Sequence, residues 1–342
     1  MARRRRRLRA AVVVATAATA LLAATPSASA ETVLWMGGTG GSLAALLPPD
    51  LFGTPETFLG GAFTDHQFTV VDYPSGLWPI TGLKDPTLGR SVEIGTANLV
   101  TAARTTPGPL VLAGVSQGAM AVQQAEAELN SDPAIPSDTT FIIIADPNLG
   151  LASGLHGVYI PILDYTPRPP VDTRFTTIIV TNQYDGFGQP IARPGNLLTV
   201  VNAVMGTAYV HPFAQNSDLA AVPPGNVTTT VNSQGGTVTN YLVPTAQLPL
   251  TTPLRRLGVS DKVVDGIDAS LRPIIDAGYV ERPQPRPARS LDARRCAPSA
   301  RAAAVRRGST AEPAGVSASV RTEGFSSPRA AAGTSGRRSP GR

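Results

Sequence analysis

Short apolar runs alternate with stretches of helical periodicity from Glu31 onward, and this alternation predicts the elements of the fold. Runs of adjacent apolar residues predict buried strands, whereas apolar residues spaced three or four apart predict helices. The predicted strands cover 32–38, 68–74, 109–114, 140–147 and 175–185, and the predicted helices cover 91–106, 117–130, 195–210 and 259–279. Buried strands that alternate with helices are typical of a parallel sheet. The pattern therefore predicts an α/β fold, with a mostly parallel sheet and helices on both of its faces.

Two segments do not follow this alternation. Residues 226–244 alternate threonine and valine around the turn-forming residues 233–236, which predicts a β-hairpin. Residues 148–173 are rich in glycine and proline and show no clear period. A long insertion of this kind is usually a lid or a surface loop, but its apolar residues are equally consistent with a pocket wall or with the core. Those residues are Leu149, Leu151, Leu155, Tyr159, Ile160, Ile162 and Leu163.

The two ends of the chain differ in composition from the middle. Residues 1–30 combine an arginine cluster, an apolar stretch and a small-residue site, which predicts a secretory signal peptide cleaved near Ala30. The apolar stretch is shorter than the roughly 20 residues of a membrane-spanning helix, and an uncleaved signal anchor is the minor alternative. Residues 281–342 contain almost no large apolar side chains, which predicts a disordered basic tail. The folded domain is therefore expected at 31–280, in a protein that is secreted or associated with the cell envelope.

The net charge of +5 does not describe the predicted domain. Residues 1–30 contain six arginines and no acidic residue, and residues 281–342 contain thirteen arginines and four acidic residues. These ends leave residues 31–280 with a net charge of −10, which argues against nucleic acid as a partner. The single cysteine, Cys296, lies in the tail, so no disulfide is expected within the domain. A domain of roughly 250 residues can rely on its core instead, because it buries about three quarters of its unfolded surface.

The segment Gly114-Val115-Ser116-Gln117-Gly118 matches the G-x-S-x-G nucleophile elbow. It lies between a predicted strand and a predicted helix, where a sharp turn lifts the serine hydroxyl clear of the sheet. Glycines at 114 and 118 leave room for neighbouring backbone, and the start of the helix directs N–H groups toward a developing oxyanion. The motif alone is weak, and the alternative is a turn whose serine only caps the helix. The context favours Ser116 as a nucleophile, with the Gln117 N–H as an oxyanion donor.

The glycine-rich loop after the first strand, residues 36–42, is the expected source of a second oxyanion donor. Its backbone N–H groups are accessible, and those of Gly38 and Thr39 are the expected donors. A phosphate-binding loop is excluded because no Lys-Ser or Lys-Thr pair follows the glycines. A dinucleotide-binding motif is excluded because Leu43 stands where it needs its last glycine. A plain tight turn is the remaining alternative.

A serine nucleophile needs a histidine base, and in hydrolases with this elbow the histidine follows both the serine and the acid. The chain has three histidines, and His66 precedes Ser116, which is the wrong order. His156 lies within the insertion, and it follows Asp146 too closely for separate strands to present the two residues. His211 is therefore the favoured base, and the alternative is that it is an ordinary core or surface histidine.

The acid is expected at the end of a strand, at the sheet edge where such folds place their active sites. Asp146 and Asp185 both end an apolar strand. Asp185 is favoured because 26 residues separate it from His211, which is enough for an intervening helix, whereas Asp146-Pro147 favours a turn. No histidine pair, cysteine cluster or acidic array has metal-ligand spacing, so neither a metal nor another cofactor is expected.

With these residues located, the chain resembles the PE-PPE domain of mycobacteria and related actinobacteria, a family of serine α/β-hydrolases. The matching stretches occur in the family's order over about residues 31–258. They are VLWMGGTG, VLAGVSQGAMA, FIIIADPNLG, TNQYDGF, VNAVMGTAYVH and NYLVPTAQLPLTTPLRRLG. The resemblance implies an α/β-hydrolase-like fold, and by position it assigns Ser116, Asp185 and His211 to the family's catalytic triad.

The resemblance implies a secreted or envelope-associated serine esterase that acts on acyl esters or lipids through an acyl-enzyme. Some family members are implicated as acyltransferases that build trehalose-based envelope lipids, so an acyltransferase is the alternative enzyme. A protein that keeps the fold but only binds the membrane or envelope surface is the alternative of a different class. Two features depart from the family: a predicted signal peptide stands where a PE or PPE helical module is expected, and the arginine-rich tail has no recognised counterpart.

Overall fold

The computed structural model describes residues 31–42 and 57–279 of the 342-residue chain. The predicted signal peptide at 1–30 and the predicted tail at 281–342 lie outside the described residues. Within the two described ranges, no helix combines the length and the apolar character needed to cross a membrane.

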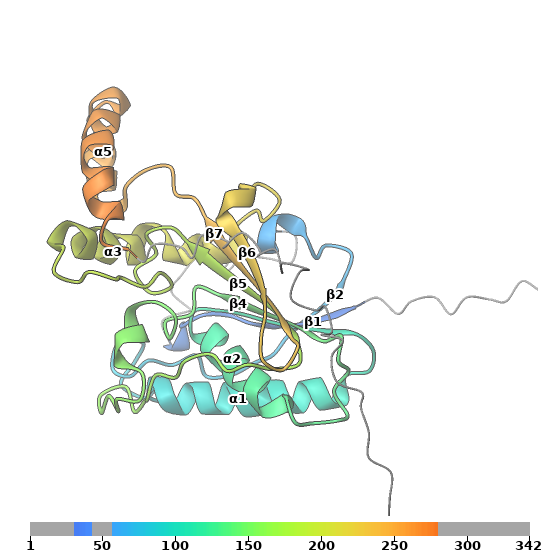
Figure 1. The fold of residues 1–342 in the computed structure, drawn as a ribbon. Coiled ribbons are helices and arrows are strands. Elements are labelled where there is room, and N and C mark those ends of the chain that lie inside the picture. The colour runs from blue at the N-terminus through green and yellow to red at the C-terminus, as the bar shows by residue number, and fades with distance from the viewer. Residues whose placement is uncertain (1–30, 43–56, 280–342) are drawn as a thin grey trace, which may run out of the picture. The chain divides into compact units, whose positions relative to one another are not determined.

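In this part of the chain, seven strands form one sheet in the order β2-β1-β3-β4-β5-β7-β6 (Figure 1). Neighbouring strands are parallel except β7 and β6, which form the predicted hairpin at the sheet edge. The strands are β1 (Thr32–Met36), β2 (Gln67–Val70), β3 (Leu110–Val115), β4 (Thr140–Ile144), β5 (Thr176–Asn182), β6 (Val227–Val231) and β7 (Thr237–Val243). The predicted α/β fold with a mostly parallel, α/β-hydrolase-like sheet is confirmed.

The longer helices lie where the periodicity predicts them, with small differences at their ends. They are α1 (Leu88–Thr105), α2 (Gln117–Leu129), α3 (Leu197–Tyr209) and α5 (Asp261–Asp276), and the short α4 (Thr252–Arg256) precedes α5. α1 begins earlier than predicted because the Thr87 side chain caps it and accepts a hydrogen bond from the Arg90 N–H at 3.3 Å. Short 3-10 helices occur at Phe58–Gly61, Leu151–Leu155, His211–Asn216, Pro224–Asn226 and Pro249–Thr251.

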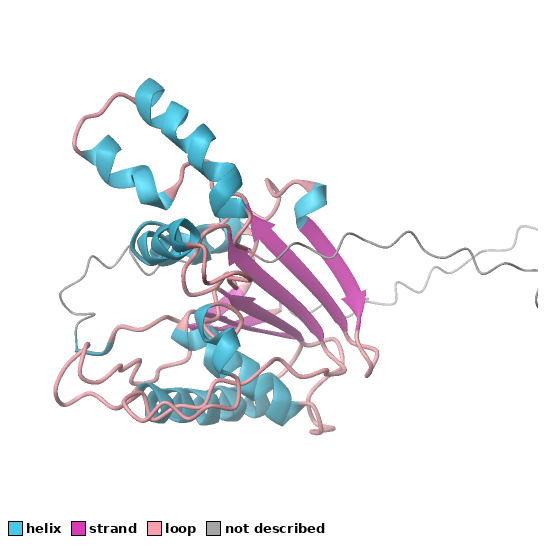
Figure 2. Cartoon of the chain, turned by 60° about the vertical axis from the view of Figure 1, so that its left-hand side comes forward, coloured by secondary structure: helices cyan, strands magenta, loops and turns pink. Residues whose placement is uncertain are grey.

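One face of the sheet is covered by α1 and α2, which lie side by side along it (Figures 1 and 2). Successive side chains of a strand point to opposite faces, and Leu34, Leu112 and Ile143 point to these helices and pack with them in the larger core. Burial of each such side chain contributes about 1.5–3 kcal/mol. Because the opposite face is buried as well, the strands carry apolar residues at consecutive positions.

The opposite face of the sheet is also covered, but by short 3-10 helices rather than by long helices. Val111 and Ile144 point to this side and share a second core with Phe58 and Ala214. Phe58 begins one 3-10 helix, and Ala214 lies in the 3-10 helix that begins at His211. Packing of this second core therefore also determines where His211 lies relative to the sheet.

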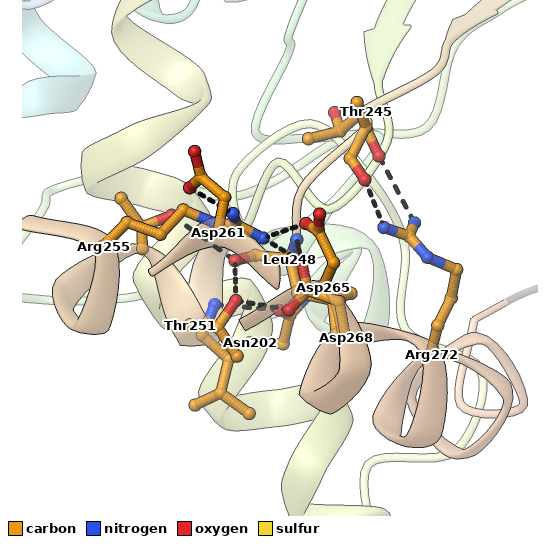
Figure 3. A network of polar contacts seen from close by, with 12 residues as sticks. Asn202, Thr245, Leu248, Thr251, Arg255, Asp261, Asp265, Asp268 and Arg272 are labelled. Carbon is orange, nitrogen blue, oxygen red and sulfur yellow. Dashed lines mark hydrogen bonds and ion pairs between the residues drawn. The ribbon is translucent and has the colours of Figure 1, made fainter. Parts of the chain in front are cut away.

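A network of polar contacts joins the C-terminal helices α4 and α5 (Figure 3). The Arg255 guanidinium donates to Asp261 and Asp265 at 2.7 Å each and to Asp268 at 3.1 Å. Asp261 and Asp265 are exposed, so these two ion pairs contribute about 0–1 kcal/mol each. Asp268 is buried and also accepts from the Thr251 hydroxyl. Loss of its donors would leave a buried charge unpaired, so Asp268 is the residue on which this network depends.

The same network reaches α3. The Asn202 side chain, on α3, accepts a hydrogen bond from the Leu250 N–H at 3.1 Å. On the α5 side, Arg272 donates to the Thr245 carbonyl at 3.3 Å and to the Tyr184 hydroxyl at 2.8 Å. α3 is thus held against the segment that follows β7, and α5 against the segments that follow β5 and β7.

Asp146 is a buried carboxyl group immediately after β4, and its side chain is 1% exposed. Its Oδ1 accepts from the Asn148 N–H at 2.8 Å, while its Oδ2 has no partner among the described residues. Burial raises the pKa of Asp146 from 3.8 to about 7, and the hydrogen bonds with Asn148 offset only part of this effect. The folded protein therefore keeps a proton on Asp146 at mildly acidic pH.

We expect this carboxyl group to destabilise the protein as the pH rises from about 4 to about 7, because the unfolded chain has already released the proton that the folded protein retains. The variant Asp146→Asn removes the titration and keeps an oxygen for the Asn148 N–H. Its free energy of unfolding relative to the wild type should rise by on the order of a few kcal/mol between about pH 5 and pH 8 in denaturant titrations. A relative free energy that does not change with pH contradicts a protonated, buried Asp146.

Candidate active site

Ser116 lies at the corner between β3 and α2, with φ 55° and ψ −117°. A residue other than glycine in such a conformation costs about 1–3 kcal/mol, which the surrounding structure must offset. The Ser116 N–H donates to the Ile144 carbonyl at 2.9 Å, and the Ser116 carbonyl accepts from the Met120 N–H at 3.2 Å. The predicted sharp turn between strand and helix is present, and these backbone hydrogen bonds hold Ser116 between β4 and α2.

The two glycines of the elbow allow backbone segments to approach closely. A Cβ atom on Gly114 would overlap the backbone of Gly118. A Cβ atom on Gly118 would overlap the carbonyl groups of Met36 and Gly37, at the end of β1. Any side chain at either position would push α2 away from the sheet and move Ser116 with it.

His211 contacts both other residues of the predicted triad. Its Nε2 lies 2.8 Å from Ser116 Oγ. Its Nδ1 lies 2.9 Å from Asp185 Oδ2 and 3.0 Å from Asp185 Oδ1. A carboxylate can only accept, so the ring donates its Nδ1–H to Asp185 and offers Nε2 as the acceptor for the Ser116 hydroxyl proton. This tautomer is the one that a general base needs.

Asp185 follows β5 and is fully buried. Besides the His211 ring, its Oδ1 accepts from the Phe187 N–H at 2.9 Å. The Phe187 ring lies edge-on to the His211 ring, with 4.8 Å between centroids. Both the acid and the base are therefore held in place by Phe187, one through a backbone hydrogen bond and the other through a ring contact.

Close contact between α3 and the loop that carries Asp185 brings the acid and the base together. Gly206, on α3, lies against the Tyr184 carbonyl, and a Cβ atom there would overlap it. Gly186 lies against the Ala203 carbonyl in the same way. Since α3 ends immediately before His211, these two contacts set the distance between the His211 ring and the Asp185 carboxylate.

The predicted oxyanion donors lie beside Ser116. A Cβ atom placed on Gly38 would be 3.3 Å from the Ser116 Cβ, so this loop touches the elbow. Gly38 and Thr39 line the same cavity as Ser116. Gln117 is the first residue of α2, and N–H groups in a first helical turn have no acceptor within the helix. The Gln117 N–H therefore has no acceptor within the helix, and Gly38 and Thr39 lie beside the serine in the same cavity.

The loop of Gly38 and Thr39 is held by a tyrosine that the sequence patterns did not identify. The Tyr73 hydroxyl donates to the Gly37 carbonyl at 2.7 Å and lies 3.5 Å from the Gly38 carbonyl. Burial raises the pKa of Tyr73, so the hydroxyl stays protonated and remains a donor. Tyr73 and Gly37 are 36 residues apart, so no local motif could have indicated this contact.

The side chain of Gln117 is buried and joins the elbow to neighbouring segments. Its amide group donates to the Gly76 carbonyl at 2.7 Å, and its oxygen accepts from the Ser91 hydroxyl at 3.4 Å. The Gly76 N–H in turn donates to Ser91 Oγ at 3.0 Å. The side chain of Gln117 therefore has a structural role, and only its N–H group is available as an oxyanion donor.

Ser116 and His211 open onto a cavity of about 540 Å³, within the usual size range of ligand pockets. Most of its wall is apolar, and no Lys, Arg, Asp or Glu among the described residues lines it. Much of the wall comes from residues 151–167, within the insertion whose role the sequence left open. The insertion therefore forms the wall of a pocket next to the candidate nucleophile.

The other acid and histidines that the sequence offered make contacts outside this site. Asp146 is hydrogen-bonded to Asn148 rather than to a histidine. His156 Nε2 lies 2.7 Å from the Asn148 carbonyl, and His66 pairs with Glu31 at 3.4 Å. In the described ranges, no group of three His, Cys, Asp or Glu side chains has the arrangement of a metal site. The geometry thus selects Asp185 and His211 as the partners of Ser116.

Comparison with solved structures gives only weak likenesses. A cutinase of Trichoderma reesei in complex with a phosphonate inhibitor is 23% identical, covering 54% of this chain and 76% of that chain with a TM-score of 0.27. A Xanthomonas campestris protein assigned to the α/β superfamily of hydrolases is 15% identical, covering 72% of this chain and 97% of that chain with a TM-score of 0.29. At such TM-scores neither likeness bears on the site.

Three relatives from Mycobacterium tuberculosis are considerably more similar. SL1278 acyltransferase Chp1 is 41% identical over 269 residues, which cover 75% of this chain and 66% of that protein. Diacyltrehalose acyltransferase Chp2 is 40% identical over 240 residues, which cover 64% of this chain and 67% of that protein. Esterase PE16 is 31% identical over 264 residues, which cover 71% of this chain and 49% of that protein. The chain therefore spans between half and two thirds of the length of these curated relatives.

A model of the PE-PPE domain matches residues 64–280 of this chain. The match includes Ser116, Asp185 and His211, and it ends next to the last described residue, Tyr279. The resemblance indicated by the sequence motifs is confirmed: this chain belongs to the PE-PPE domain family.

Proposed function

We propose that this chain is a serine-dependent enzyme that acts on acyl esters through an acyl-enzyme intermediate. The observation that carries the proposal is the position of His211, which is within hydrogen-bond distance of both the Ser116 hydroxyl and the Asp185 carboxylate. Three polar groups in this order can generate a serine nucleophile at neutral pH. A protein that only binds the cell envelope would not need Ser116, His211 and Asp185 to be aligned in this way.

In the proposed first step, Ser116 Oγ attacks the ester carbonyl carbon while His211 Nε2 takes the hydroxyl proton. The carbonyl oxygen becomes an oxyanion, for which the N–H groups of Gln117 and of Gly38 or Thr39 are the proposed donors. The bond to the alcohol oxygen then breaks, and that oxygen takes the proton from His211. The acyl group remains on Ser116 as an ester.

In the proposed second step, an acceptor hydroxyl gives its proton to His211 Nε2 and attacks the acyl carbonyl carbon. The bond to Ser116 Oγ breaks, and Ser116 recovers the proton from His211. If the acceptor is water, the product is a carboxylic acid and the enzyme is an esterase. If the acceptor is a sugar hydroxyl, the product is a new ester and the enzyme is an acyltransferase.

Two observations favour acyl transfer as the second candidate function. The relatives that are 41% and 40% identical are named acyltransferases, whereas the relative that is 31% identical is named an esterase. The cavity beside Ser116 is largely apolar, and an apolar site that excludes water protects an acyl-enzyme from hydrolysis. One of these relatives is named for diacyltrehalose, so we propose a trehalose glycolipid as an acceptor to test.

We further propose that the protein acts outside the cytoplasm, at the cell envelope. The composition of residues 1–30 supports export, because it has the charged, apolar and small-residue regions of a signal peptide in the required order. A glycolipid substrate would be found at such a surface.

A fluorophosphonate probe should label the wild-type protein on Ser116, because phosphonylation requires an activated serine. Labelling and ester turnover should be lost in Ser116→Ala, and His211→Gln should lower kcat by a factor on the order of 10⁵–10⁶. The matched control is His66→Gln, which removes a histidine far from the site and should leave labelling within about twofold. Equal labelling of the wild type and Ser116→Ala, or near-normal turnover by His211→Gln, contradicts the proposal.

Removal of the Tyr73 hydroxyl should loosen the loop of Gly38 and Thr39 without changing the cavity wall. For Tyr73→Phe we expect kcat to fall about tenfold or more with little change in KM, since an oxyanion donor acts mainly in the transition state. Steady-state kinetics and a thermal melt of each protein measure the two effects separately. An unchanged kcat, or a rise in KM alone, shows that Tyr73 does not position an oxyanion donor.

Acyl transfer and hydrolysis can be separated by their products. Purified protein given a long-chain acyl ester and a trehalose glycolipid should form more acylated glycolipid than free acid, as resolved by mass spectrometry, if the apolar cavity excludes water. Ser116→Ala is the control for uncatalysed transfer. Formation of free acid alone rejects the transferase candidate and leaves the esterase.

A further inference from the structure

The insertion forms one side of the cavity, and the body of the fold forms the other. Leu151, Leu155 and Leu163 line the cavity from the insertion, while Leu88 and Met120 line it from α1 and α2. The cavity therefore extends from Ser116 into a space whose wall, among the described residues, is mostly apolar. Hydrocarbon is the chemical class that such a wall favours, because it offers few partners for a polar group.

The insertion is attached to the start of α1. The Gly89 N–H donates to the Leu163 carbonyl at 2.9 Å, so Leu163 lies directly beside the residue that follows Leu88. The Thr87 hydroxyl donates to Asp164 at 3.3 Å. Leu88 and Leu163 thus lie where the insertion contacts α1, and both line this part of the cavity.

The insertion is also attached from inside, by buried polar side chains. The Tyr165 hydroxyl donates to the Asn148 side chain at 3.1 Å and accepts from Gln124, on α2, at 3.3 Å. The Asn148 amide donates to Gln123, also on α2, at 2.7 Å. Each of these groups would lose a buried hydrogen bond if the insertion lifted away. The wall is therefore held at several points, and the cavity has a set size.

At the other end of the insertion, the Leu151 N–H donates to the Phe187 carbonyl at 3.1 Å. Phe187 is the residue that contacts both Asp185 and His211. The wall of the cavity and the candidate catalytic residues are therefore parts of one connected structure.

We propose that this part of the cavity is a subsite for the hydrocarbon chain of the acyl group, and that Leu163 sets the longest chain that fits. The proposal rests on the proposed acyl-enzyme at Ser116 and adds the class of acyl group. The whole cavity beside Ser116 has a volume of about 540 Å³. An acetyl group leaves most of this volume unfilled, whereas a medium or long alkyl chain fills it.

The test compares esters of one alcohol whose acyl chains lengthen from acetyl to hexadecanoyl. Each buried methylene should raise kcat/KM by about fourfold, until the chain fills the cavity and the increase stops. The variant Leu163→Trp reduces the volume, so the increase should stop at a chain several carbons shorter. Leu163→Ala changes the volume in the opposite sense and should move the limit to longer chains.

Ile162→Trp is the matched control. Ile162 is adjacent to Leu163 but its side chain is 60% exposed and does not line the cavity. This variant should leave the chain-length profile of the wild type unchanged. A profile that is the same for Leu163→Trp and Ile162→Trp, or a wild type that prefers the acetyl ester, overturns the subsite even though Ser116 is active.

A binding measurement separates failure of the subsite from failure of the proposed function. Dodecanoate should bind to Ser116→Ala in calorimetric titrations, and the affinity should fall at least tenfold when Leu163→Trp is added but not when Ile162→Trp is added. This pattern without turnover of any ester supports the subsite and rejects the acyl-enzyme. Turnover without any effect of Leu163→Trp on binding or on chain length rejects the subsite and leaves the acyl-enzyme.

Discussion

The candidate site depends on the close backbone contact between α3 and the loop after β5. Gly206 on one side and Gly186 on the other leave no space between the two segments. Asp185 lies in that loop and His211 follows α3, so the contact fixes the hydrogen bond between them. A buried carboxylate needs its donors, and a histidine base needs a fixed ring and tautomer. The same contact supplies both requirements.

Several other features of the structure serve this contact. The Leu250 N–H bonds to Asn202 on α3, and the Thr199 hydroxyl on α3 donates to the Ile275 carbonyl of α5, so the neighbouring 3-10 helix and α5 are both held against α3. The second core buries Ala214 and so holds the segment that begins at His211 against the sheet. Parallel strands bring Ser116, at the end of β3, and Asp185, just after β5, to the same edge. The fold thus positions one serine hydroxyl through several elements that are far apart in sequence.

The insertion connects the chemistry at Ser116 with the choice of substrate. It is attached to α1, to α2 and to Phe187, which itself contacts Asp185 and His211. An apolar wall in this position would favour an alkyl chain and keep water from the ester carbon at the same time. Chain selection and the balance between transfer and hydrolysis would then share one physical cause, which is the removal of water from the cavity.

The strands, the longer helices and the elbow were predictable, because each rests on local periodicity or on a local motif. Ser116 could be located from its glycines, and Asp185 and His211 from their order after it. The sequence favoured Asp185 over Asp146 but could not decide between them, because both residues end a buried strand. Only the fold shows that Asp146 accepts a hydrogen bond from Asn148.

Other features depend on contacts that no local pattern contains. The hydrogen bond from Tyr73 to Gly37 joins residues 36 positions apart. The pocket wall at 151–167 has no period, because apart from one short 3-10 helix its residues are held by contacts with α1 and α2. The pattern predicted helices on both faces of the sheet but did not indicate that short 3-10 helices would cover the second face.

A crystal structure of the protein inhibited by a long-chain alkyl phosphonate would test the central claim most directly. The account predicts a covalent bond from Ser116 Oγ to phosphorus, with one phosphonyl oxygen within hydrogen-bond distance of the N–H groups of Gln117 and of Gly38 or Thr39. His211 should remain bonded to Asp185, and the alkyl chain should lie along Leu163. A phosphonate on another residue, or a His211 ring turned away from both Ser116 and Asp185, would contradict the account.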